Sequence, residues 1–176
     1  MKQHVITVLV ENKAGVLARI VGLISGRGFN IDSLNVAPTQ DPTVSRMTIQ
    51  VIGDDRVLEQ VSKQLNKLID IIKVSDLTTE RFIARELVIV KVAAPPEKRN
   101  EIKELAALIK SQILSVQANS IILQLVGDQE QVGEFISLLR PFRVLEISRT
   151  GVVAVAKGDV NGHNGGREKP DKDQRR

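Results

Sequence analysis

The pattern of apolar and polar positions over residues 1–78 predicts four strands and two helices. Residues 4–10 are nearly continuously apolar, which is typical of a strand covered on both faces. From Leu17 to Ile24, apolar residues recur at the i, i+3, i+4 and i+7 positions. A second helix is predicted from the apolar stripe of Leu58, Val61, Leu65 and Leu68. Shorter apolar or alternating blocks predict the other strands, at residues 30–37, 47–51 and 71–74.

The same order of elements recurs in the second half of the chain. A strand at residues 86–93 is followed by two prolines and by a helical stripe from Ile102 to Ile109. The sequence Val-Gly-Asp at residues 126–128 repeats Ile-Gly-Asp at residues 52–54. The remaining predicted elements are a hairpin of residues 113–117 and 121–126, a helix over 132–139, a strand at 144–147 and an extra strand at 152–156.

Both halves therefore have the order βαββαβ, which is that of a split βαβ or ferredoxin-like unit. We predict an α+β protein of two consecutive ferredoxin-like domains, residues 1–78 and 79–158, joined at residues 77–85 without a long flexible linker. The two prolines in residues 38–45 are predicted to interrupt pairing between neighbouring strands. Residues 159–176 contain one aliphatic residue among Gly, Asn and charged residues, which predicts a disordered tail.

Composition narrows the function classes more than it changes the fold. Apolar residues make up 42% of the chain but aromatic residues only 2%, so the core must be aliphatic. The absence of Cys excludes disulfides and thiolate chemistry and fits a reducing compartment. No apolar run reaches the roughly 20 residues of a membrane span, and no early segment resembles a signal peptide. We expect a soluble, cytoplasmic protein with no membrane partner.

Charge and aromatic content argue against nucleic-acid binding. The net charge is +4, and half of this excess lies after Ala156, so the two domains have a weakly basic surface. A four-stranded open sheet can stack RNA bases, but this mode needs aromatic residues on the central strands. The strands at residues 3–10 and 46–52 contain none. We therefore expect no nucleic-acid partner.

The residue types that carry catalysis or bind metals are missing or scattered. His4 opens a strand and His163 lies in the tail, so no second His or Cys completes a nucleophilic triad or a metal site. Adjacent Asp54 and Asp55 fit the start of a helix better than an acid–base pair. The glycines of residues 22–28 match neither a phosphate loop nor a dinucleotide fingerprint. We predict no catalytic site, metal or cofactor in this chain.

One face of the first sheet is predicted to need a partner. In the strand at residues 4–10, both alternating sets of side chains are largely apolar, so neither face suits water. The helices can cover only one of these faces. Self-association is the simplest source of a second cover, and we predict a homodimer.

The turn between the first strand and the first helix is the candidate binding site. Backbone N–H groups of Gly15, Val16 and Leu17 at a helix N-terminus can receive an anion such as a carboxylate. Asn12 and Asn30 would each add a side-chain amide. Ile31 and Leu17 would offer an apolar wall. Such a set suits a small branched amino acid. A strand-to-helix turn also uses Asn and Gly for backbone reasons alone, and that explanation stays open.

Three motifs in the first half resemble a known family. They are E-N-x-x-G-x-L-x-R at residues 11–19, R-G-F-N-I at 27–31, and S-L-x-V-A-P-T followed by S-R-M-T between 33 and 48. Together they resemble the ACT domain of the small, regulatory subunit of acetolactate synthase (acetohydroxyacid synthase). The similarity continues through residues 58–74 and, more loosely, to about residue 158.

This resemblance implies a regulatory chain rather than a catalyst. Members of the family bind a large catalytic subunit that uses thiamine diphosphate, Mg and FAD, raise its activity, and confer feedback inhibition by valine, sometimes with leucine or isoleucine. The effector is expected between the ACT domains of a dimer, with Asn30 contributed by the partner chain. The matching positions are Asn12, Gly15, Val16, Leu17, Asn30 and Ile31.

Two further expectations accompany the resemblance. The corresponding turn of the second domain, A-A-P-P-E-K-R-N-E, has prolines and no Gly, so we expect one effector site per ACT domain and none of that type in the second domain. The alternative function is a stand-alone amino-acid-responsive ACT protein that regulates a transcriptional or transport partner. The chain shows no helix-turn-helix and no basic helix, which disfavours this alternative.

Overall fold

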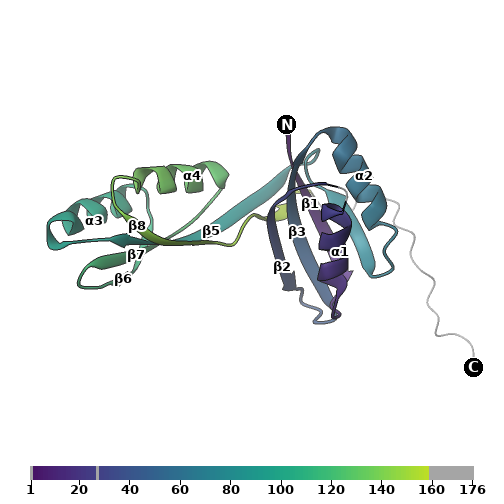
Figure 1. Cartoon of the computed structure of the whole chain (residues 1–176), viewed down its shortest axis with the longest axis horizontal. Coiled ribbons are helices and arrows are strands. Elements are labelled where there is room, and N and C mark those ends of the chain that lie inside the picture. The colour runs from purple at the N-terminus through teal and green to yellow at the C-terminus, as the bar shows by residue number, and fades with distance from the viewer. Residues whose placement is uncertain (1, 27, 159–176) are drawn as a thin grey trace, which may run out of the picture.

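Two antiparallel sheets, each covered on one face by two helices, lie side by side in the computed structural model (Figure 1). The structure describes residues 2–26 and 28–158. The predicted disordered tail, with His163, lies outside these residues. The predicted α+β class and the repeated ferredoxin-like order are confirmed.

The first domain follows the predicted order βαββαβ. Its sheet has the strand order β2-β3-β1-β4, so β1 and β3 are central and β2 and β4 are edge strands. All of its strand pairs are antiparallel. The elements are β1 (Lys2–Glu11), α1 (Val16–Ser25), β2 (Ile31–Pro38), β3 (Val44–Gly53), α2 (Asp55–Leu65) and β4 (Ile71–Asp76).

Alternation along the central strands divides the sheet into a helix-covered face and an open face. Ile6, Val8 and Val10 of β1 belong to one buried cluster with α1 and α2, so the residues between them point to the open face. On α1 the buried positions are Val16, Ile20 and Ile24. The predicted stripe began one residue late, at Leu17, which is 41% exposed. The helix starts at Val16, and the i, i+4, i+8 row is the one that faces the sheet.

The second domain repeats the arrangement with one addition. Its sheet has the strand order β6-β7-β5-β8, and β9 pairs with the first part of β5. At the corner after β7, Asp128 Oδ1 accepts from Gln131 N and Gln131 Oε1 accepts from Asp128 N, which caps α4. The elements are β5 (Phe82–Ala93), a 3₁₀ turn (Pro96–Lys98), α3 (Arg99–Leu108), β6 (Gln112–Val116), β7 (Ser120–Gly127), α4 (Gln129–Leu138), β8 (Val144–Arg149) and β9 (Val153–Ala156).

Part of the predicted connection between the domains is a strand. Residues 82–85 form the beginning of β5 and pair with β9, from Phe82 opposite Ala156 to Arg85 opposite Val153. A chain that enters its second domain through a paired strand has less freedom than the predicted link. Figure 1 shows β5 running from the first domain into the second.

The β5–β9 ladder covers part of the open face of the first sheet. Val152 and Ala154 form a buried cluster with Val5 of β1 and with Leu77. Val5 was predicted to need a partner chain, but the second domain of the same chain covers it. The predicted homodimer therefore does not follow from this part of the face.

Polar contacts fix the same junction. Ser33 of β2 donates to Gln50 Oε1 at 3.1 Å and accepts from the backbone N–H of Val152 at 3.4 Å. Beside it, Glu86 is 2% exposed and accepts from Arg149 Nε at 2.5 Å and from Arg149 Nη2 at 2.9 Å. The hydrogen bond to Glu86 raises the pKa of Arg149. A buried carboxylate held by a bidentate guanidinium is costly to leave unpaired, so this pair favours one arrangement of β5 and β8.

The loop between β2 and β3 does not interrupt strand pairing as widely as predicted. Pro38 is the last residue of β2 and lies opposite Ser45 of β3, and the Thr39 N–H donates to Val44 O at 2.8 Å. Pro38 is tolerated there because β2 is an edge strand, on which a missing N–H does not break a central ladder. The predicted break is confined to residues 39–43.

Alanine substitutions on β3 should distinguish the helix-covered face of the first sheet from its open face. Ile49→Ala on β3 is expected to lower the free energy of unfolding by about 2–5 kcal/mol, because Ile49 is fully buried among the helix-covered residues. Ile52→Ala on the same strand removes a side chain that is 39% exposed, with an expected cost of no more than about 1 kcal/mol. Urea unfolding of both variants measures the difference, and equal losses would contradict the assigned faces.

A pair of glycine substitutions tests the domain junction. Gly151 has φ +74°, and a Cβ added there would lie 2.8 Å from Ser33 Cβ. Gly151→Ala should therefore destabilise the chain by at least about 1 kcal/mol. Gly133→Ala, inside α4 where a Cβ meets no atom within 4 Å, should stabilise it by about 0.5–1 kcal/mol. Thermal unfolding measures whether each variant is stabilised or destabilised. An unchanged stability of Gly151→Ala would show that the backbone at the junction can move to accept a Cβ.

Candidate effector-binding site

Gly15 shapes the turn that joins β1 to α1. It has φ 84° and ψ −13°, a left-handed conformation that a side chain disfavours, and it directly precedes the first residue of α1. A Cβ built at Gly15 would meet no atom within 4 Å. The glycine is therefore required by its backbone conformation, and the space beside it is open.

The turn presents backbone donors at the start of a ten-residue helix. The Val16 N–H donates to Lys13 O at a long 3.4 Å, whereas the N–H groups of Gly15 and Leu17 have no acceptor within the part of the chain that is described. No side chain caps this helix, and its first turn has no acidic residue. The positive end of the helix dipole is therefore without a protein anion, an environment that suits a bound carboxylate.

The side chains of the predicted site differ in how they can contribute. Val16 is 3% exposed and packs in the core, so only its N–H faces the turn. Leu17 is 41% exposed and offers apolar surface beside the donors. Asn12 is exposed, but its Nδ2 donates to Pro42 O at 2.9 Å and its backbone N–H donates to Thr43 O at 2.6 Å. Asn12 thus also holds the β2–β3 loop.

One chain does not bring the six predicted residues together. Asn12, Gly15, Val16 and Leu17 lie at the N-terminal end of α1, and Asn30 and Ile31 follow its C-terminal end. Ten helical residues separate the two groups by about 15 Å along the helix axis. In the sheet, Ile31 pairs with Val51, whereas the end of β1 pairs with Val44, at the opposite end of β3. Asn30 and Ile31 thus belong to the far end of the domain.

Charged neighbours fix the turn from both sides. Arg19 of α1 forms an ion pair with Asp70 at 2.7 Å, and Asp70 O accepts from the Glu11 N–H at 2.9 Å. Lys13 Nζ contacts Glu11 Oε2 at 2.8 Å, and this hydrogen bond raises the pKa of Lys13. The conspicuous Arg of the first motif is accordingly occupied by a structural contact with α2–β4, not with the turn.

The sequence reasoning did not include the β2–β3 loop in the site. This loop, residues 39–43, contacts Asn12 through Pro42 and Thr43. Asp41 holds the loop from within, because its Oδ1 accepts from Thr43 N at 2.9 Å and from Thr43 Oγ1 at 2.7 Å. These hydrogen bonds lower the pKa of Asp41, and the bond from the Thr43 hydroxyl has the larger effect. Pro38 of the third motif and Pro42, which follows it, were the available signal for an ordered loop.

Other kinds of site find little support in the described residues. Across residues 2–26 and 28–158, no group of three or more His, Cys, Asp or Glu side chains is placed to hold a metal ion. His4 is fully buried in β1. None of the described helices has both the length and the apolar composition to cross a bilayer.

Two family models match the chain, one in each domain. An AHAS small subunit-like ACT domain matches residues 6–73, and the small subunit of acetolactate synthase matches residues 85–158. The chain belongs to the acetolactate synthase small-subunit family. The three motifs that suggested the resemblance all lie within residues 6–73, the range of the first match.

Relatives cover nearly the whole of the described chain. A probable acetolactate synthase small subunit of Archaeoglobus fulgidus is 52% identical over 157 residues, which are 89% of this chain and 98% of the relative. The acetolactate synthase small subunit of Haemophilus influenzae is 48% identical over 90% of this chain and 98% of its own. The crystal structure of the small subunit from Thermotoga maritima has 36% identity and a TM-score of 0.83, covering 91% of this chain and 100% of its own.

A pH titration tests the Asp41 contacts that order the loop. Because the pKa of folded Asp41 is lowered, its hydrogen bonds are fully present above the ordinary Asp pKa of about 4 and are lost as pH falls through the folded pKa. The Thr43 amide resonance should therefore titrate with a midpoint below about 4. In Thr43→Val, which lacks the hydroxyl, the Asp41 midpoint should rise. An unchanged midpoint would contradict the assigned cause.

Proposed function

We propose that this chain is the non-catalytic regulatory subunit of acetolactate synthase, that it binds and activates the large catalytic subunit, and that it confers feedback inhibition by valine. The observation that carries the proposal is the Gly15 turn, with its uncapped helix N-terminus, inside a match to the small-subunit ACT family. The match of the second domain to the same subunit supports it over the whole described chain.

The proposal assigns the chemistry to the partner. Thiamine diphosphate, Mg and FAD are expected on the large subunit, and none of them on this chain. We expect the complex in the cytoplasm, and the absence of Cys from this chain agrees with a reducing compartment. The relatives are themselves described as small subunits of acetolactate synthase, which supports a separate large partner.

We further propose that the effector lies between two copies of the ACT domain. The turn with Asn12, Gly15, Val16 and Leu17 would receive the carboxylate, and Asn30 and Ile31 of a second copy would complete the pocket. The separation of these groups at the two ends of α1 supports a pocket built from two chains. Edge strand β2, whose outer backbone groups can pair with another strand, offers a surface for such a homodimer.

Regulation requires that valine bind two states of the complex unequally. If valine binds more tightly when two ACT domains are in contact, its binding favours that state of the complex. The β5–β9 ladder joins the ACT domain to the second domain through backbone pairs and apolar contacts. The effector need not touch the large subunit to change its activity.

A matched pair of substitutions at Gly15 tests the site. Gly15→Asn and Gly15→Asp add side chains of equal size, and both residues tolerate a positive φ better than other side chains do. Asp also places a negative charge beside the proposed carboxylate of valine. Titration calorimetry should therefore show valine binding at least about tenfold weaker in Gly15→Asp than in Gly15→Asn, a difference of about 1.4 kcal/mol. Equal binding by the two variants would contradict a carboxylate at this turn.

A further inference from the structure

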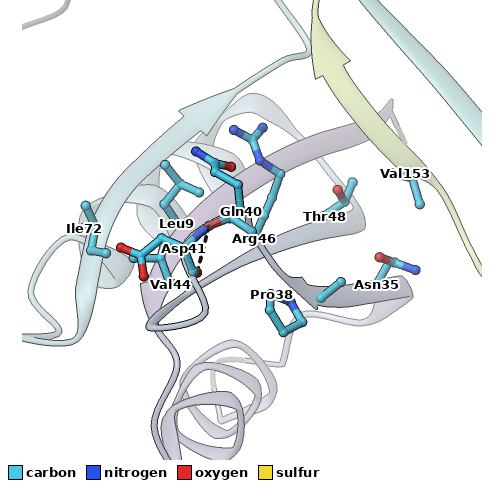
Figure 2. A pocket seen from close by; sticks show the side chains of 12 residues that line it. Leu9, Asn35, Pro38, Gln40, Asp41, Val44, Arg46, Thr48, Ile72 and Val153 are labelled. Atoms are coloured by element: carbon cyan, nitrogen blue, oxygen red, sulfur yellow. Dashed lines mark hydrogen bonds between the residues drawn. The ribbon is translucent and has the colours of Figure 1, made fainter.

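The chain's own β5–β9 ladder covers only part of the open face of the first sheet. Val152 and Ala154 cover the part around Val5, and another part of the face forms a groove of about 510 Å³ (Figure 2). Val153 of β9 borders the groove, so the groove continues the surface that already receives an apolar strand. We call it the ACT groove, and its lining includes Leu9, Asn35, Val44, Arg46, Thr48 and Ile72.

The ACT groove combines an apolar wall with a polar floor. Leu9 is half-buried and Ile72 is 54% exposed, whereas Thr48, in the middle of β3, is 2% exposed. A volume of this size is in the range that holds a compact ligand or one short segment of a partner. The apolar wall by itself would accept many occupants, so the charges must select among them.

Arg46 is the one basic side chain that lines the ACT groove, and its guanidinium is unpaired within the described residues. Arg46 lies opposite both Leu9 and Ala37 in the strand pairs, and in Figure 2 it extends from the sheet beside Gln40. The Arg46 side chain has no ion pair or hydrogen bond with any residue of 2–26 or 28–158. Lys73 of β4, next to the groove-lining Ile72, lies opposite Leu9 on the other side, and its side chain is likewise without a partner among those residues.

The one carboxylate that lines the ACT groove, that of Asp41, is not paired with Arg46. Asp41 Oδ1 accepts two hydrogen bonds from Thr43, and no ion pair joins this carboxylate to Arg46 among the described residues. The Arg46 guanidinium therefore lacks a counter-ion within this part of the chain. A partner that brought an apolar side chain and a carboxylate would fill the wall and pair the free guanidinium at once.

We propose that the ACT groove is a docking site for the large catalytic subunit, and that it takes an apolar segment of that subunit with an adjacent Asp or Glu. This inference rests on the proposed function, which supplies the large subunit as partner. A second copy of this chain fits less well. A two-fold contact through the groove would bring the Arg46 and Lys73 of each copy toward those of the other, and like charges oppose such a contact.

The ACT groove shares a loop with the proposed effector site. Residues 38–41 of the β2–β3 connection form one wall of the groove. The next two residues of the loop, Pro42 and Thr43, accept hydrogen bonds from Asn12, which also opens the effector turn. Effector binding at that turn and docking in the groove would therefore act on the same loop, which provides a physical route for unequal affinities.

Charge reversal on the two sides of the sheet tests the docking site. Arg46→Glu reverses the charge in the ACT groove, and Arg56→Glu makes the same change on α2, which covers the opposite face. The large subunit, purified from the same source, serves as the probe, and its dissociation constant is measured with each immobilised full-length variant. Arg46→Glu should weaken binding at least about tenfold, and Arg56→Glu should leave it near the wild-type value.

A second pair of variants tests the apolar wall independently of Arg46. Ile72→Glu places an acid at the edge of the ACT groove, and Ile69→Glu places one at a position that is 83% exposed and outside the groove lining. Ile72→Glu should weaken binding of the large subunit, and Ile69→Glu should not. Both residues are exposed, so each variant is expected to fold, and thermal unfolding verifies this before binding is compared.

The outcomes separate this inference from the proposed function. Equal binding by wild type and Arg46→Glu, or equal losses in Arg46→Glu and Arg56→Glu, would overturn the docking site while the wild-type affinity still supports the regulatory function. A smaller oligomer of Arg46→Glu in sedimentation of the chain alone would assign the ACT groove to a second copy and would also overturn it. Failure of the wild-type chain to bind the large subunit would overturn both proposals. Valine binding by Arg46→Glu should remain unchanged.

Discussion

The β5–β9 ladder, packed on the first sheet, is the contact on which the arrangement of the two domains depends. A sheet with both helices on one face leaves its other face open, and here the chain covers part of that face with its own second domain. Four backbone pairs, from Phe82 to Arg85, join the strands, and Val152 and Ala154 provide the apolar contact. Apolar burial and backbone pairing thus act at the same place, and both hold the second domain against the first sheet.

This constraint also determines where function can lie. The covered part of the open face is unavailable to other molecules, whereas the ACT groove, the Gly15 turn and edge strand β2 are not covered by the second domain. Asn12 connects the ACT groove with the Gly15 turn through Pro42 and Thr43. The Gly15 turn follows β1 and the β2–β3 loop precedes β3, and these two strands pair along their whole length.

Much of the fold was predictable because apolar periodicity reports directly which face of an element is buried. All the predicted strands and helices are present, including the extra strand after Gly151. The errors arose where tertiary contacts override local pattern. The prediction took Leu17 as the first core position of α1, whereas the structure buries Val16. Residues 82–85 were predicted to be part of the link because their pairing partner lies some 70 residues later. Local pattern carries no information about so distant a partner.

The sequence alone determined the ferredoxin-like order, the glycine turn and the family to which its motifs belong, because these depend on residue type and short spacing. Only the tertiary structure decided that Val5 is covered from within the chain, that Asn30 and Ile31 lie far from Asn12, and that Arg46 stands unpaired in a groove. The physical reason is that burial and charge pairing depend on distances between strands. Those distances exist only after both sheets have formed and packed.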